Sequence, residues 1–347
     1  MKNVFLYTLI LLYTACNPMS DYRQEYLPPK YKQNYKSEIN ILNNELVLRQ
    51  TNDMQIFDNY LVLPAVSVDN SNVFQLLSTN DGHLIKGFAY LGRGTNELSD
   101  YQRYNIDNTS KILYALDGSN KLIGFNLDSI IDGNRNYCII SKHFDSPFPA
   151  ARQVQVLDNK IFQLGGSQNP RIFITNIEGD TLLKYDNIPY ISANHKFDSG
   201  FSKKFMTHYS HYTIKPDMKK IANVTNNGMM LEILSISNTN IQSERIRYFY
   251  EPQMESLRQP LNECVFGATQ IQGTNKYIYV LYYDSQMKFV ENSTPIMGVF
   301  DWDGNEVACY NLNNHVTSFV VTPDDTRIYC WAYNSEGVGY LGFLDLS

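Results

Sequence analysis

Short apolar runs of about four to seven residues alternate along the chain with turns rich in Asp, Asn and Gly. Runs of this length, with polar residues at alternate positions, predict β-strands that are joined by hairpins. No long segment carries the apolar period of an α-helix, so we expect less than about a tenth of the chain to be helical. The pattern therefore predicts an all-β protein.

One of these strands recurs six times, at intervals of roughly fifty residues. In its two clearest copies it follows a turn with a basic residue: Pro216-Asp217-Met218-Lys219-Lys220-Ile221 and Pro323-Asp324-Asp325-Thr326-Arg327-Ile328. The six strands begin at Leu61, Ile112, Ile161, Ile221, Ile278 and Ile328. A repeat of this length is typical of propellers and solenoids, in which every unit packs on its neighbours.

Each repeat also has an apolar strand before this one and further strands after it, which predicts four-stranded blades. Tight turns at 80–82, 178–180 and 303–305 lead into the fourth strands. The segment Asp301-Trp302-Asp303-Gly304-Asn305 resembles the start of a calcium loop. Its Gly comes too early for such a loop, so we interpret the segment as a hairpin turn.

The sixth repeat lacks an outermost strand, because little chain remains after the strand expected at 340–344. An additional apolar strand, at about residues 45–48, precedes the first repeat. We predict that it pairs beside 340–344 and completes the last blade, since an open blade would leave unpaired strand edges. The predicted fold is a six-bladed β-propeller of four-stranded blades that spans residues 39–347.

The N-terminus has the features of a secretory signal: Lys2, an apolar run at 4–13, and Ala15 directly before Cys16. The run is too short to span a bilayer, which takes about 20 residues. We predict a lipoprotein signal peptide at 1–15, a lipidated Cys16 that tethers the protein to the membrane, and a flexible tether at 16–38. The alternative is an ordinary cleaved signal with an incidental Cys. We expect the bacterial cell envelope, with the outer membrane favoured and the leaflet left open.

The Pro-Asp-x-x-Lys/Arg-Ile turns resemble those of the TolB-like propellers, in which the same hairpin separates the first and second strands. The segment Leu91-Gly92-Arg93-Gly94-Thr95-Asn96-Glu97-Leu98 also resembles a Gly-rich loop that follows a blade in that group. With its lipoprotein start, the chain resembles a six-bladed TolB-like lipoprotein of Bacteroidetes type. The resemblance implies a fold and an envelope location, and no particular reaction, because propellers host many unrelated functions.

Charged residues make up 18% of the chain and the net charge is −6, so no basic surface for nucleic acid is expected. The chain has no sequence motif for a bound phosphate or an activated nucleophile. His208 and His211 lie three apart in an expected loop or strand, where that spacing does not place both on one face for a metal. We assign no catalytic residue and expect no metal or cofactor. The four later cysteines fit buried free thiols, and the pair to check for a disulfide is Cys309 with Cys330.

The loops that lead into each new blade are expected on one face, around the mouth of a central channel. The two longest are 189–211 and 249–265, and long loops in a compact domain are often functional. Basic residues on these lead-in loops are the candidate ligand contacts: Arg93, Arg152, His195, His208 and Arg258. Together they predict a locally basic mouth that suits a carboxylated or sulfated ligand.

We therefore favour a membrane-tethered module that binds a glycan, peptide or protein partner through its loop face. The second hypothesis is an enzyme, a lyase or hydrolase, which needs an acid and a base or a set of metal ligands converging at the channel. The third is a structural subunit of an envelope complex, which requires an exposed apolar patch of several hundred Å².

Overall fold

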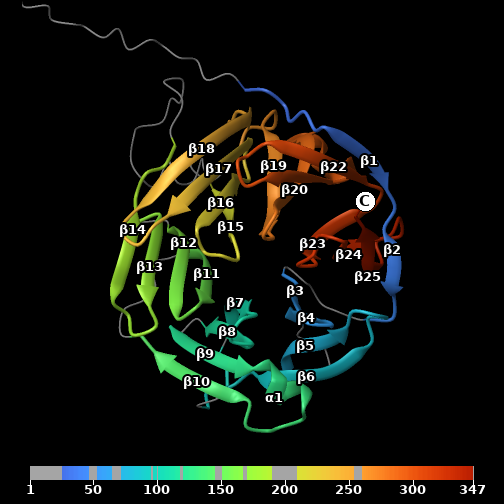
Figure 1. The fold of residues 1–347 in the computed structure, drawn as a ribbon. Helices are drawn as coiled ribbons and strands as arrows, with labels where there is room; N and C mark the ends of the chain where they lie inside the picture. Colours follow the sequence, from blue (N-terminus) through green and yellow to red (C-terminus); the bar gives the residue numbers. More distant parts are fainter. Residues whose placement is uncertain are drawn as a thin grey trace, which may run out of the picture.

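Six β-sheets surround a central channel as blades in a computed structural model of the chain (Figure 1). The structure describes residues 26–46, 53–64, 72–94, 97–99, 101–117, 120–144, 151–166, 170–189, 209–253 and 260–346. The expected six-bladed, all-β propeller is confirmed. Helix is confined, within these ranges, to α1 (Leu127–Ile131) and the 3-10 helix η1 (Met287–Asn292). No helix in the described part of the chain is long and apolar enough to cross a membrane.

Within each blade, the strands follow one another from the channel outward (Figure 1). Blade 1 consists of β3 (Gln55–Phe57), β4 (Tyr60–Pro64), β5 (Asn72–Ser78) and β6 (Leu84–Tyr90). Blade 2 consists of β7 (Tyr101–Asp107), β8 (Ile112–Asp117), β9 (Lys121–Asn126) and β10 (Cys138–His143). Blade 3 consists of β11 (Ala151–Leu157), β12 (Lys160–Gly166), β13 (Ile172–Asn176) and β14 (Thr181–Tyr185). Blade 4 consists of β15 (Ser210–Ile214), β16 (Lys220–Thr225), β17 (Met229–Ile236) and β18 (Ile241–Tyr250). Blade 5 consists of β19 (Val265–Gly273), β20 (Tyr277–Gln286), β21 (Ile296–Asp301) and β22 (Glu306–Leu312). Blade 6 contains β23 (His315–Val321), β24 (Arg327–Tyr333) and β25 (Gly339–Asp345). The N-terminal strands β1 (Gln33–Ser37) and β2 (Asn40–Asn43) join blades 5 and 6 from outside.

The hydrophobic core lies between blades, because both faces of a blade pack on its neighbours. One cluster joins β16 and β17 of blade 4 to β20 and β21 of blade 5, and another joins blades 5 and 6. The second strands are therefore nearly continuous apolar runs, and β8 is buried at all six positions. The four described cysteines are free, and three of them, Cys264, Cys309 and Cys330, are buried as expected, whereas Cys138 is partly buried. Burial raises the pKa of Cys330 to about 12.

The turns between first and second strands explain the polar residues that mark the repeat. Asp58, Lys111, Met218 and Asp325 occupy the left-handed region, with φ of 50°, 58°, 56° and 59°. Short polar side chains tolerate this conformation better than most, which favours Asp and Asn in such turns. The Asp301–Asn305 segment is confirmed as a hairpin turn, because Asp301 N donates to Asn305 O at 3.0 Å.

An N-terminal strand completes blade 6, as predicted. It is β2, which pairs antiparallel with β25, so the closing strand lies about five residues before the expected 45–48. Ile39, just before β2, is buried against Gly342, where an added Cβ would lie 2.5 Å from Ile39 Cγ2. Ile39 therefore sets the register of the closing strand. The backbone turns away afterwards, where Glu45 N donates to Asn43 Oδ1 at 2.8 Å. Residues 47–50 lie outside the described ranges.

The segment 26–46 runs along the outer edges of blades 4, 5 and 6, and we call it the belt (Figure 1). Three of its tyrosines pack on aromatic rings of these blades: Tyr26 on Tyr248, Tyr31 on Phe300, and Tyr35 on Tyr310, with ring centroids 5.9, 5.6 and 4.9 Å apart. Strand β1 pairs parallel with β22 and gives blade 5 a fifth strand. The flexible tether was predicted to extend to residue 38, but these tyrosines and β1 hold residues 26–37 against the propeller.

Candidate ligand site in the central channel

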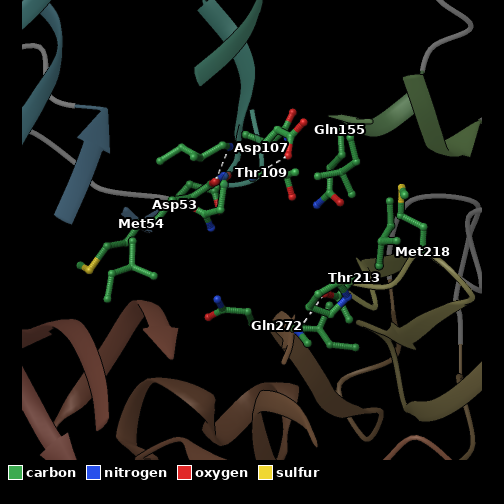
Figure 2. A pocket seen from close by; sticks show the side chains of 18 of the residues that line it. Asp53, Met54, Asp107, Thr109, Gln155, Thr213, Met218 and Gln272 are labelled. Carbon is green, nitrogen blue, oxygen red and sulfur yellow. Dashed lines mark hydrogen bonds between the residues drawn. The ribbon is translucent and has the colours of Figure 1, made fainter. Parts of the chain in front are cut away.

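The innermost strands surround a cavity of about 260 Å³ in the channel. Figure 2 shows the side chains of Asp53, Gln155, Thr213 and Gln272, which come from four different blades and surround one hollow. The cavity extends toward the turns between first and second strands, since Thr109, Asp158 and Met218 of these turns also line it. This is the end of the channel opposite to the lead-in loops.

Polar side chains on the inner strands fix each blade to the next one. Gln55 of blade 1 accepts from Ile106 N at 2.7 Å and donates to Tyr104 O at 3.2 Å. The same kind of contact recurs at the following junctions: Asn105 with Val156, Gln153 with Tyr212 N, Thr213 with Gly273 N, Gln270 with Phe319, and Gln272 with Val321 N. We call these residues the amide girdle, with Thr213 as its one hydroxyl member.

The girdle holds the channel wall in one shape before any ligand arrives. At the junction of blades 6 and 1 the link lies further out, where Tyr329 donates its hydroxyl proton to Thr79 O at 3.1 Å. A cluster of apolar side chains from β3, β4, β23 and β24 covers the same junction. The cavity is therefore pre-formed, as ligand sites usually are.

Asp53 is the carboxylate of the cavity that has no hydrogen-bond or ion-pair partner among the described residues. It is exposed to solvent in the channel, and no residue in the described ranges donates a hydrogen bond to it. The surrounding blades remove part of the bulk water, and this desolvation raises the pKa of Asp53 to about 6. Asp53 thus changes charge within a physiological pH range.

The other two carboxylates of the cavity are already engaged. Asp107 is buried and accepts hydrogen bonds at both oxygens, from Thr109 N at 3.0 Å and Ser110 Oγ at 2.9 Å. Asp158 lies at the rim, 4.0 Å from the Lys160 ammonium group. The described lining contains no Lys, Arg or His, so the cavity has negative potential and favours cationic groups or hydrogen-bond donors.

The basic residues predicted from the sequence are not brought together by the described part of the structure. Arg93 is exposed on the loop between blades 1 and 2 and does not line the cavity. Arg152 lies in β11, and only its backbone is described. His195, His208, Arg258 and Cys16 lie outside the described ranges. The basic mouth on the lead-in loops stays a prediction.

The Gly-rich loop around Arg93 has a structural explanation. The Glu97 carboxylate folds back over the loop and accepts from Gly94 N at 2.8 Å. An added Cβ on Gly92 would lie 1.9 Å from Glu97 Oε2, so this position has no room for a side chain. Lys121 Nζ donates to Gly94 O and Glu97 O, and Leu98 is fully buried. Gly92, Gly94 and Glu97 therefore have structural roles on either side of residues 95–96.

The sequence reading missed a buried ion pair between blades 3 and 4. Arg171 donates through Nη2 to Glu232 and through Nη1 to Asn187 O at 2.8 Å, and Asn223 donates to the same Glu232 oxygen at 2.9 Å. Burial disfavours the charged form of Arg171, but Glu232 more than offsets this and raises the pKa of the guanidinium group. The available signal was the single Glu in the apolar strand β17. Its partners identify the pair as a link between blades.

The fold and the channel define a ring-closed, six-bladed β-propeller. The family described as TolB-like 6-blade propeller-like matches residues 30–324, and the chain belongs to this family. The match begins inside the belt, which agrees with the belt being part of the propeller. The predicted resemblance to TolB-like propellers is thus confirmed.

Two solved structures from Bacteroides share the architecture. One is a presumed exported protein of Bacteroides fragilis NCTC 9343, at 12% identity and a TM-score of 0.52, covering 90% of this chain and 99% of that one. The other is a member of the DUF4221 family from Bacteroides vulgatus ATCC 8482, at 11% identity and a TM-score of 0.54, covering 93% of this chain and 96% of that one. At these identities the likeness shows the fold alone. No curated protein matches the chain.

Proposed function

We propose that the protein is an exported propeller of the cell envelope that acts by binding, and that its channel accepts a ligand group with a positive charge or several hydrogen-bond donors. The observation that carries the proposal is Asp53, an accessible carboxylate without a described partner in a pre-formed cavity whose described lining has no cation. An opposite charge on the ligand would restore the stabilisation that Asp53 loses by partial desolvation.

Binding is favoured over catalysis because the polar groups of the wall already have structural roles. The girdle side chains bond the backbone of the neighbouring blade, and both oxygens of Asp107 are occupied. Acid–base catalysis would need a second titratable group that faces Asp53 at hydrogen-bonding distance. Among the described residues, Asp53 has no such neighbour.

The membrane tether extends this proposal to the place of action. Tyr26 packs on Tyr248 of β18, and Leu27 N donates to Tyr248 O at 3.1 Å, so the belt leaves the propeller at the outer edge of blade 4. A lipidated Cys16 would lie about ten residues away, which in extended form spans at most about 35 Å. The anchor would thus keep this edge close to the membrane. The fold shared with a presumed exported protein of Bacteroides fragilis is consistent with export.

The test is a thermal-shift screen of the mature chain with Cys16→Ser, at pH 7.5. The cationic probes are spermidine, trilysine and a chitosan trimer, with maltotriose as the neutral comparator and trigalacturonate as the acidic one. A ligand at 100 times its Kd adds about 2.7 kcal/mol to the free energy of unfolding, which raises the Tm measurably. We expect a cationic probe to raise the Tm of the parent chain, but not that of Asp53→Asn.

The matched control is Asp132→Asn, which removes one exposed carboxylate far from the channel and should respond like the parent. A response to trigalacturonate alone would contradict the channel proposal and favour the basic mouth of the lead-in loops. Failure of all probes would leave a protein partner as the better hypothesis and would also count against the Asp53 site.

A further inference from the structure

A second cavity lies between blades 3 and 4, outside the central channel. Its volume is about 800 Å³, within the range of about 300–1,000 Å³ that is typical of small-molecule sites. Strands β12, β13 and β14 form one wall, and β17, β18 and the turn before β16 form the other. We call this cavity the inter-blade groove. Figure 1 shows the two blades side by side.

The groove lies at the end of the two blades where their third and fourth strands are joined, since Thr181 begins β14 and Ser237 follows β17. Small side chains, Ser235 and Ser237, border the space on the side of blade 4. The turn residue Met218 lines both the groove and the channel cavity, so this turn separates the two.

The interior of the groove is apolar. Its floor and walls are formed by Phe162, Ile174, Leu182, Leu183, Met218 and Ile236. Leu182 is 43% exposed, although the transfer of a leucine side chain out of water lowers the free energy. An apolar ligand segment that covered Leu182 and the partly exposed Leu183, Met218 and Ile236 would bind by burying them.

The rim of the groove carries three lysines, Lys160, Lys219 and Lys220. Lys220 is engaged, since its ammonium group lies 3.0 Å from Glu244 and 3.3 Å from Asp303. Lys160 is also engaged, in a salt bridge with Asp158 at 4.0 Å. Lys219 is exposed and forms no salt bridge within the described residues. Lys219 is therefore placed to meet an anionic head group.

The carboxylates near the rim are each paired with a lysine, and Lys219 is the rim lysine without a salt bridge among the described residues. The carboxylate of Asp217 accepts from Lys215 Nζ at 2.5 Å, and Glu244 is paired with Lys220. An apolar interior with one unpaired lysine at its rim, Lys219, is complementary to a molecule that has one acyl chain and one negative charge. From this geometry we propose that the inter-blade groove binds a single-chain anionic amphiphile, such as a fatty acid. The groove does not include Asp53 and is independent of the channel site.

The proposal is tested by calorimetric titration of the mature Cys16→Ser chain with dodecanoate, below its micellar concentration, at pH 7.5. Removing the lipidated cysteine ensures that no acyl chain of the anchor competes. Decanoate should bind about fifteenfold more weakly, because it buries two fewer methylene groups. Dodecyltrimethylammonium has the same chain and the opposite charge, and it should bind more weakly than dodecanoate.

Variants then locate the site. Lys219→Glu should weaken dodecanoate binding about tenfold. Lys184→Glu is the matched control, because Lys184 lies next to Leu183 on β14 and does not line the groove; it should bind like the parent. Ser235→Phe should abolish binding by filling the groove, with its fold checked by circular dichroism.

Three results would overturn the proposal: no binding of dodecanoate, equal binding of dodecyltrimethylammonium, or equal losses in Lys219→Glu and Lys184→Glu. Binding of an acidic amphipathic peptide without binding of dodecanoate would also overturn it, in favour of a peptide partner. Asp53→Asn should leave dodecanoate binding unchanged. Failure of the groove is thus distinguishable from failure of the channel site.

Discussion

Replacing Tyr31 by Ala should destabilise the whole propeller, although Tyr31 lies in the N-terminal segment. Its ring packs edge-on against Phe300, with centroids 5.6 Å apart, and its hydroxyl is buried over Gly298. An added Cβ on Gly298 would lie 2.3 Å from Tyr31 Oη, so the glycine provides the space that the ring occupies. Burial also raises the pKa of Tyr31, which shows how fully this hydroxyl has left water.

The size of the effect follows from this packing. Removing a fully buried aromatic ring costs about 3–5 kcal/mol, and the partly exposed backbone position of Tyr31 reduces this to about 2–3 kcal/mol. For a domain of this size the Tm should fall by about 3–5 °C. The assay is thermal unfolding followed by circular dichroism, at equal protein concentration.

The matched control is Tyr90→Ala, which removes a tyrosine that is 48% exposed and should change the Tm little. Gly298→Ala should destabilise the parent but cost much less in a Tyr31→Ala background, because the clash is then gone. If Tyr31→Ala lowers the Tm no more than Tyr90→Ala does, the belt is peripheral and the reasoning fails.

Three further predictions concern the girdle, the channel and the anchor. Gln270→Leu should lower the free energy of unfolding by about 2 kcal/mol in a urea titration, because it leaves the N–H and C=O of Phe319 without their partner. An unchanged midpoint would show that the girdle hydrogen bonds do not stabilise the fold. Asp53→Asn should stabilise the fold by about 1 kcal/mol at pH 7.5 and not at pH 4. Because the pKa of Asp53 is raised to about 6 on folding, the free energy of unfolding of the parent chain falls as the pH rises from about 4 to 6. The expected change is kept to about 1 kcal/mol because Asp53 is partly screened by solvent. Equal effects of the substitution at both pH values would contradict the desolvation of Asp53. Cys16→Ser should move the protein from the membrane to the soluble fraction of the expressing cell, whereas retention in the membrane would argue against a lipid anchor.

The repeat was predictable because each blade solves the same local problem. In five of the six blades the turn before the apolar second strand has a left-handed residue, which is Asp or Asn in three of them, and an apolar residue, most often Ile, begins the strand. Closure by an N-terminal strand was predictable from the missing outermost strand of blade 6. The register of that strand was not, because it depends on Ile39 fitting against Gly342, a contact between residues at opposite ends of the chain.

The belt was missed for a related reason. Residues 26–38 are polar and lack an apolar period, so they are typical of a linker. Their tyrosines are held by rings that come from β18, β21 and β22, and only the assembled fold brings these partners together. Sequence composition alone does not distinguish such anchors from solvated tyrosines.

The candidate site shows the same limit more strongly. Lead-in loops and basic residues can be read from the chain, but the cavity is formed by side chains from separate blades. Gln55, Asn105 and Gln270 look like ordinary polar positions in strands, and their bonds to the next blade appear only in the folded ring. Asp53 precedes β3 without any motif around it. Its role follows from where the ring closes.

The most direct test of binding at Asp53 is the Kd of trilysine, measured by calorimetry for the parent chain and Asp53→Asn at pH 7.5 and pH 5. We predict that Asp53→Asn weakens binding at least about tenfold at pH 7.5, and that the parent also loses affinity at pH 5, where its carboxyl is largely protonated. Equal Kd values for both proteins at pH 7.5 would contradict a ligand site at Asp53.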